Sequence, residues 1–256
     1  MKRLRVVLEY AWTLVLIVAL LVFIIGFAFA LPIWFRPFYY MQIGPLKIEE
    51  NSGFTYDQIV KAYNDVMNYL NFGTPFAVGG LKCSAAAVSH FEDCKVLFDL
   101  DTLGVIISAV VLVGGLLLAK FAEFKPKKIA GFDYSFYTGV VGALIPPVVG
   151  IAIAVDFENA FRLFHTIFFP GKDNWLFSWY EDEIIRILPE EFFMSCGILI
   201  IVVWFAACIA LIVRGVIKRK KLLKAVAVCT EGDNPAEDAG SSRDGDFCDN
   251  SQEKTK

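Results

Sequence analysis

The sequence is poor in the residues and motifs on which most catalytic sites depend. Histidine occurs only twice in 256 residues, and no nucleophile elbow, phosphate-binding loop or dinucleotide fingerprint is present in a usable context. No cysteines have the CxxC spacing, and no histidines the HExxH spacing, of common metal sites. The formal net charge of −3 is too small to indicate a nucleic-acid partner. The sequence therefore points away from the familiar soluble enzymes, metal centres and nucleic-acid-binding proteins.

Apolar residues, in contrast, are abundant and gathered in long runs. The hydrophobic share is 57%, well above that of an ordinary globular domain. Four runs approach the roughly 18–20 residues that cross a hydrocarbon core about 30 Å thick. The first run is longer than the core of a signal peptide, so we expect it to be retained, although Ala28-Phe29-Ala30 resembles a cleavage site. The predicted spans are about 10–31, 103–120, 136–155 and 197–214.

Lysine and arginine in the flanks of these runs predict the orientation. Basic clusters precede the first run, link the second to the third and follow the fourth. The positive-inside rule places all three clusters, and hence both termini, in the cytoplasm. The longer connections, about 32–102 and 156–196, are then extracytoplasmic. We predict an all-α integral membrane protein with four transmembrane helices, N-in and C-in, and two helical extracytoplasmic loops that form a cap. The membrane domain covers 1–224, and the acid-rich segment 225–256 is predicted to be a disordered cytoplasmic tail.

Local patterns predict several details of this architecture. Phe54–Leu70 has apolar residues at helical spacing, and Thr55 with Gln58 forms a capping box at its start. Pro146-Pro147 should bend or break the third span, because proline lacks the N–H that a helix needs. Three small residues in that span should let another helix approach closely: Gly139, Gly142 and Gly150.

The first histidine, His90, lies just before the second span. Ser89-His90-Phe91-Glu92 has the pattern of a capping box, which would place His90 in the first turn of a short helix. Asp93 and Cys94, three and four residues on, would share its face, so Asp93 could orient the imidazole. The positive end of the helix dipole would keep His90 neutral, as a general base requires.

The second histidine, His165, lies in the segment Arg162–Phe193 between the last two spans. A helix through Phe157–Phe168 should carry it and stop at Pro170-Gly171, with Arg162 one turn before it on the same face. Both histidines would then lie on one side of the membrane near its surface, each with a charged neighbour. This pairing favours a catalytic site. The alternative is that both are structural residues at the membrane interface.

Three segments together resemble a known family. They are TYDQIVKAYNDVMNYL, HFEDCKVLF, and RLFHTIFFPGKDNWLF followed by IIRILPEEFF. The chain resembles the bacterial lipoprotein intramolecular transacylases over about residues 5–220. The family's HxxDVK pattern is present with Cys94 in place of valine.

The resemblance implies a specific activity. Such enzymes move the sn-2 acyl chain of the diacylglyceryl-cysteine on a lipoprotein to the cysteine's own α-amino group, giving an N-acyl, S-monoacylglyceryl (lyso-form) lipoprotein. His90 and His165 would be the catalytic acid and base, in an order that the sequence leaves open, with Asp93 and Arg162 in support. No cofactor or metal is implied. The implied partners are diacylglyceryl-modified lipoproteins and membrane lipids, and the implied location is the bacterial cell membrane, with the active site facing outward.

Alternatives from other classes stay open on sequence. One is a metal-dependent membrane lipid hydrolase, with both histidines and Glu92, Asp93 or Glu158 as ligands. Another is a non-enzymatic accessory or assembly protein. Transport is disfavoured, because the span interiors are almost free of charged residues. The six cysteines show no disulfide framework, and a bridge between Cys83 and Cys94 is possible but supported by no motif.

Overall fold

The computed structural model describes residues 2–232, and side chains within 3–227. In that range the regular elements are all helices, apart from one isolated β-bridge between Ile129 and Phe132. Four helical segments are long and apolar enough to cross a membrane. They are α1 (Lys2–Trp34), α5 (Ala85–Phe121), the pair α6 (Tyr134–Gly142) and α7 (Ile145–Val155), and α10 (Glu190–Gly232). The all-α membrane class with four candidate spans is therefore confirmed, while the orientation stays a prediction.

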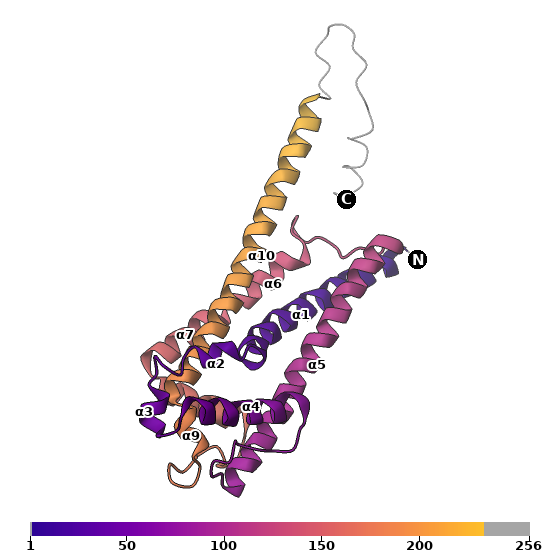
Figure 1. Cartoon of the computed structure of the whole chain (residues 1–256). Helices are drawn as coiled ribbons and strands as arrows, with labels where there is room; N and C mark the ends of the chain where they lie inside the picture. Colours follow the sequence, from indigo (N-terminus) through magenta and orange to yellow (C-terminus); the bar gives the residue numbers. More distant parts are fainter. Residues whose placement is uncertain (1, 233–256) are drawn as a thin grey trace.

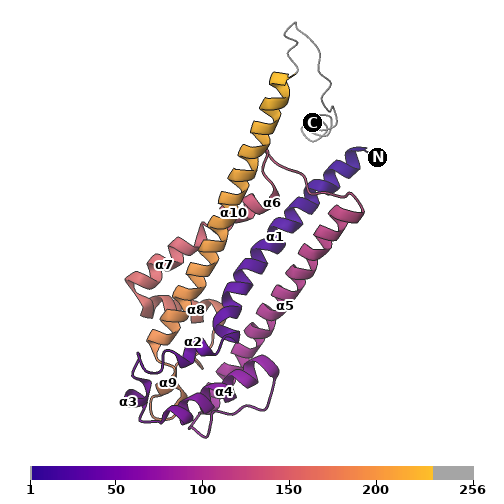
Figure 2. The same cartoon turned by 45° about the horizontal axis from the view of Figure 1, so that its top comes forward.

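These segments form an elongated bundle (Figures 1 and 2). Helix α1 packs along α5, and α6 packs along α10, while α1 also contacts α6 and α10. Large apolar side chains cover the outside of the bundle; Val110 and Leu116 of α5 are 66% and 65% exposed. An apolar exterior of this kind is suited to lipid rather than water.

Helices α5 and α10 extend well beyond the spans that the sequence predicts. Helix α5 has 37 residues, about 55 Å at about 1.5 Å per residue, whereas the hydrocarbon core is about 30 Å thick. The predicted span covers about 103–120 of this helix. The first part of α5, residues 85–102, therefore projects past the predicted span. Helix α10 continues to Gly232. Residues 225–232, which the sequence assigns to the disordered tail, continue this helix, and residues 233–256 lie outside the described part.

The third span is broken, as its prolines predict. Helix α6 ends at Gly142 and α7 begins at Ile145, with Pro146 at its start, where a missing N–H costs nothing. The predicted close approach also occurs. A Cβ on Gly139 would lie 2.7 Å from the Cys208 carbonyl oxygen of α10, and one on Gly142 would lie 2.7 Å from the Cys208 sulfur. Gly150 makes only ordinary contacts, because the nearest atom to its Cβ position belongs to Ile201 at 3.7 Å.

Short helices from both long connections gather at one end of the bundle (Figures 1 and 2). We call this part the end region; it contains α2 (Pro37–Tyr40), α3 (Ile48–Ser52), α4 (Tyr56–Phe72), α8 (Phe157–Phe168) and α9 (Ile184–Ile187). The predicted capping box of α4 is present: the Thr55 hydroxyl accepts from the Gln58 N–H, and the Gln58 side chain accepts from the Thr55 N–H.

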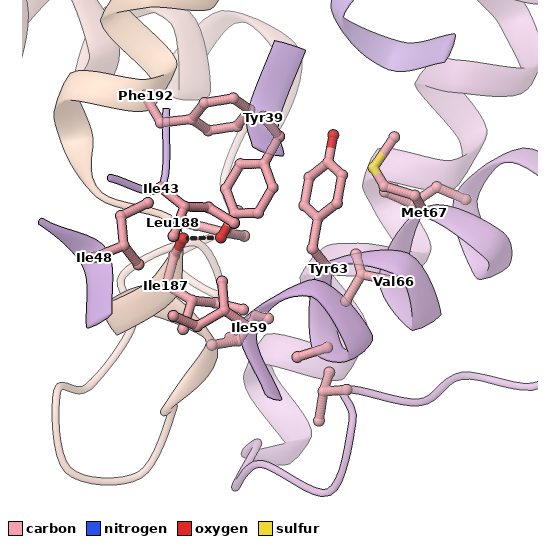
Figure 3. Close-up of a cluster of buried hydrophobic side chains, with 14 of the residues drawn as sticks. Tyr39, Ile43, Ile48, Ile59, Tyr63, Val66, Met67, Ile187, Leu188 and Phe192 are labelled. Carbon is pink, nitrogen blue, oxygen red and sulfur yellow. Dashed lines mark hydrogen bonds between the residues drawn. The ribbon is translucent and has the colours of Figure 1, made fainter. Parts of the chain in front are cut away.

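An aromatic and aliphatic core joins the two connections (Figure 3). The rings of Tyr39 and Tyr63 stack with centroids 3.9 Å apart, and Phe192 of α10 meets Tyr39 edge-on at 5.0 Å. The Tyr39 hydroxyl donates a 2.6 Å hydrogen bond to the carbonyl of Ile187. A core built from separate parts of the chain holds the end region against the bundle. His165 lies on α8 of this region, and His90 directly precedes Phe91 of α5, which packs in the same core.

Candidate active site

The two histidines meet between α5 and α8. The ring centroids of His90 and His165 are 5.7 Å apart, and each residue is only 7% exposed. Their helices come from the two long connections that the sequence places on one side of the membrane. The structure therefore brings together the pair that sequence reasoning selected.

The start of the His90 helix differs from the sequence prediction. Ser84, not Ser89, caps α5, its hydroxyl accepting from the Ala87 N–H. His90 therefore lies in the second turn of a long helix, and Ser89 is free to contact another segment. The capping-box interpretation is wrong because either serine could begin the helix. Ser84 is fixed at that position by its backbone N–H, which donates a 2.7 Å hydrogen bond to the Asp182 carboxylate.

His165 has a defined tautomer. Its Nδ1 lies 2.8 Å from the carbonyl oxygen of Phe161. A carbonyl can only accept, so Nδ1 carries the proton and Nε2 has the lone pair when the ring is neutral. The rings of Phe161 and Trp175 lie over the imidazole at 4.2 and 4.7 Å. His165 thus presents a proton acceptor in an aromatic surround.

His90 has one engaged and one unpartnered nitrogen. Its Nε2 is 3.4 Å from the Cys94 sulfur, while its buried Nδ1 has no hydrogen-bond partner within the described chain. Phe169 and Phe177 pack on the ring at 4.9 and 5.5 Å. A buried nitrogen without a partner is available to a substrate.

Burial keeps both imidazoles neutral at pH 7. It lowers the pKa of His90 from 6.5 to about 4, and the neighbouring His165 and Lys172 act in the same direction, against Asp93. Burial also lowers the pKa of His165, although the bond to Phe161 opposes it. The predicted neutral state of His90 therefore has a different cause, because desolvation and not a helix terminus disfavours the charged ring.

A loop after α8 covers the pair and engages Asp93. We call residues 169–178 the strap. Lys172 forms an ion pair with one oxygen of Asp93, and the Asn174 Nδ2 donates to the other at 2.9 Å and to the Ser89 hydroxyl at 3.4 Å. These bonds hold the pKa of Asp93 below its usual value. Asp93 was expected to orient His90. Its hydrogen bonds instead anchor the strap, because Lys172 brings an opposite charge to the same carboxylate.

Arg162 is paired within its own helix and not with His165. Its guanidinium pairs with Glu158 one turn earlier at 2.7 Å, and its side chain is 58% exposed. His165 instead takes its hydrogen bond from the α8 backbone at Phe161. The supporting role of Arg162, in which it would contact the substrate, stays a prediction.

The remaining polar groups make no metal cluster in the described part of the chain. Within residues 2–232, no three side chains of histidine, cysteine, aspartate or glutamate converge as ligands would. Cys83 and Cys94 are free thiols and are not bridged. Burial raises the pKa of Cys94 to about 12, so its sulfur is a neutral neighbour of His90.

Sequence reasoning missed the residues of the strap. Lys172 and Asn174 reach α5 from far along the chain, and Trp175 closes over His165. Asp182, only 3% exposed, secures the strap's end by accepting from the Ser178 N–H at 2.9 Å. The only sequence signal was the polar segment GKDN inserted between aromatic residues.

Fold and site together define the class: an integral membrane protein with two neutral, contacting imidazoles at one end of its helical bundle. A family model described as lipoprotein intramolecular transacylase Lit matches residues 14–193. The chain belongs to this family of membrane transacylases.

Solved structures agree with this assignment. The membrane-integral lipoprotein intramolecular transacylase Lit from Bacillus cereus matches with a TM-score of 0.73 and 25% identity, over 84% of this chain and 98% of that chain. A variant of that protein with one histidine replaced by arginine has the same fold, with a TM-score of 0.69 and 24% identity over 88% of this chain and 97% of that one. An uncharacterized protein of Aquifex aeolicus is 26% identical over 53% of this chain. That match covers only 57% of the relative's length.

Proposed function

We propose that the protein moves the sn-2 acyl chain of a lipoprotein's diacylglyceryl-cysteine to the α-amino group of the same cysteine. The observation that carries this proposal is the contact between two buried, neutral histidines. Aminolysis of an ester needs a base for the amine and an acid for the departing alcohol, and two neutral imidazoles can divide these roles.

The tautomers favour one division of the roles between the two histidines. His165 Nε2 carries a lone pair, because Nδ1 donates to Phe161. It takes one N–H proton of the amine as the new bond forms; the amine has a pKa of about 8 in solution and attacks in its neutral form. The Cys94 sulfur lies 3.4 Å from Nε2 of His90. We assign the thiol as the donor of this contact, which places the ring's proton on Nδ1, the unpartnered nitrogen. His90 Nδ1 gives this proton to the sn-2 oxygen as the ester C–O bond breaks.

The transfer balances without a cofactor. The new bond joins the α-nitrogen to the acyl carbon, and the bond that breaks joins that carbon to the sn-2 oxygen. His165 gains one proton from the amine and passes it to the His90 ring, whose Nδ1 proton goes to the sn-2 oxygen, so both rings end neutral and no imidazolate anion is left. Because attacker and target belong to one molecule, the protein's main task is to position them.

The aromatic surround fits a reaction that must exclude water. Phe161 and Trp175 flank His165, and Phe169 and Phe177 flank His90. Water at the acyl carbon would release a free fatty acid, whereas a dry site leaves the amine as nucleophile.

The site also suits a membrane-anchored substrate. His90 lies on the part of α5 that extends beyond the predicted span, so the ester of a diacylglyceryl anchor would meet it near the membrane surface. With both termini cytoplasmic, as the basic clusters predict, this surface is the extracytoplasmic one. The end region would then cap the bundle on that side.

The test is mass spectrometry of lipoprotein N-terminal peptides from a host with and without the protein. We expect unchanged total mass with one acyl chain moved from glycerol to nitrogen, and loss of this shift in His90→Ala and His165→Ala. Thr166→Ala, an exposed neighbour on α8, is the matched control and should convert normally.

Three outcomes would contradict the proposal. Near-normal conversion by either histidine variant would refute the paired mechanism. A total mass lower by one acyl chain would indicate a lipid hydrolase, and loss of activity with strong chelators would make it metal-dependent. No change with a well-inserted protein would favour an accessory role.

A further inference from the structure

Asn174 has an amide orientation that the structure determines chemically. Its Nδ2 lies 2.9 Å from a carboxylate oxygen of Asp93 and 3.4 Å from the Ser89 hydroxyl. The ionised carboxylate can only accept, so the nitrogen must face it and the oxygen must face away. The hydrogen bond between Asn174 and Asp93 therefore fixes the direction in which the Asn174 Oδ1 can accept.

That oxygen is buried and has no partner in the described chain. Leaving a buried acceptor unpaired costs free energy, so native structures seldom contain one without a water, an ion or a ligand to fill it. Nothing about the strap's attachment requires this oxygen, because the amide nitrogen alone makes the bonds to α5. The unused acceptor is best explained by a ligand with an N–H or O–H group.

Asn174 lies beside residues that border each of the two histidines. Its partner Ser89 directly precedes His90, and the residue after it, Trp175, packs on His165 at 4.7 Å. The His90 Nδ1 is buried and unpartnered as well. Two unpartnered hydrogen-bonding groups, one of which can only accept, thus lie on segments that border the histidine pair.

The charges nearby select a neutral donor. Lys172 compensates the charge of Asp93 directly beside Asn174. With that anion already paired and both imidazoles buried, the site offers no free negative charge to a cation. A neutral amine suits it better than an ammonium ion.

We propose that the Asn174 Oδ1 accepts a hydrogen bond from the α-amino group of the diacylglyceryl-cysteine. This inference rests on the proposed function. A neutral primary amine has two N–H groups and one lone pair: His165 takes one N–H proton, Asn174 holds the other N–H, and the lone pair points to the ester carbonyl. Asn174 is thus a substrate-positioning residue, supported by Asp93 and Ser89.

The experiment measures binding of two unreactive ligands to the full-length protein in detergent. Both are diacylglyceryl-cysteine peptides with an ether in place of the sn-2 ester, which prevents transfer. One has the free α-amine, and the other has hydrogen in its place. Wild-type protein should bind the amine ligand about tenfold more tightly, the usual order for one buried hydrogen bond.

Asn174→Leu and Asn174→Ala should lower that affinity ratio several-fold, and the contact of the amine with His165 keeps the remainder. Asp173→Ala, the exposed neighbour in the strap, is the matched control and should keep it. A strap that is merely loosened would weaken both ligands equally and leave the ratio unchanged. The ratio therefore separates recognition of the amine from structural damage.

A ratio that persists in both Asn174 variants would overturn the assignment, as would a wild-type protein with no preference. If both variants fail to fold, a wild-type protein without a preference still overturns the assignment. Conversion of the ester substrate is assayed in parallel. Conversion without amine preference refutes only the role of Asn174, whereas absence of conversion refutes the proposed function.

Discussion

Acidification should destabilise the folded protein through His90. Burial lowers the pKa of this residue from 6.5 to about 4, whereas the unfolded chain restores the ordinary value. Between these two pH values the unfolded state binds a proton that the folded state does not, so stability is lost as the pH falls. Above pH 6.5 both states are neutral, and the effect disappears.

The magnitude follows from the width of that window. The interval from 6.5 to about 4, at about 1.4 kcal/mol per pH unit, corresponds to about 3 kcal/mol. His165, whose pKa burial also lowers, adds a loss of the same sign. A loss of this size is a large part of the net stability of a typical domain, about 5–15 kcal/mol.

Two measurements test this reasoning. Because the chain has only two histidines, selective ¹³C labelling of histidine, without a polyhistidine tag, gives two ring signals whose titration reports both pKa values. His90→Gln assigns the signals and removes the titrating group. Wild-type protein should lose more thermal stability between pH 7 and pH 4 than this variant does. A His90 signal that titrates near 6.5, or an equal loss in the variant, would refute the burial argument.

Two further predictions concern packing. Gly139→Ala should destabilise the protein by about 1–3 kcal/mol, because its Cβ would lie 2.7 Å from the backbone oxygen of Cys208. Gly114→Ala, whose Cβ would meet nothing within 4 Å, is the control, and thermal unfolding in detergent compares the two; equal effects would contradict the close approach of α6 to α10. Tyr39→Phe removes the 2.6 Å bond to the Ile187 carbonyl and should cost about 1–3 kcal/mol, because that carbonyl loses its hydroxyl partner. Hydrogen exchange at α9 should rise with it, and unchanged exchange would show that this bond does not hold the two connections together.

Several features of the protein could be read from the sequence because they depend on local properties. Whether a run of residues can span a membrane depends on its length and apolarity, and the four spans were predicted on that basis. The capping box at Thr55 and the break at Pro146-Pro147 likewise follow from residues a few positions apart. The two histidines stood out because there are no others.

The contacts of the site were decided only by the tertiary structure. Helical spacing correctly placed Asp93 and Cys94 one turn after His90, but it could not show which neighbour each would bind. Asp93 bonds to Lys172 and Asn174, which lie far along the chain, and not to His90. An ion pair and a charge-assisted hydrogen bond stabilise a carboxylate more than a hydrogen bond to a neutral imidazole does. Burial, which sets the charge of both histidines, is likewise a property of the packed chain. The sequence determined the four apolar spans and which residues are rare, and the packing of the strap against α5 determined which partners those residues have.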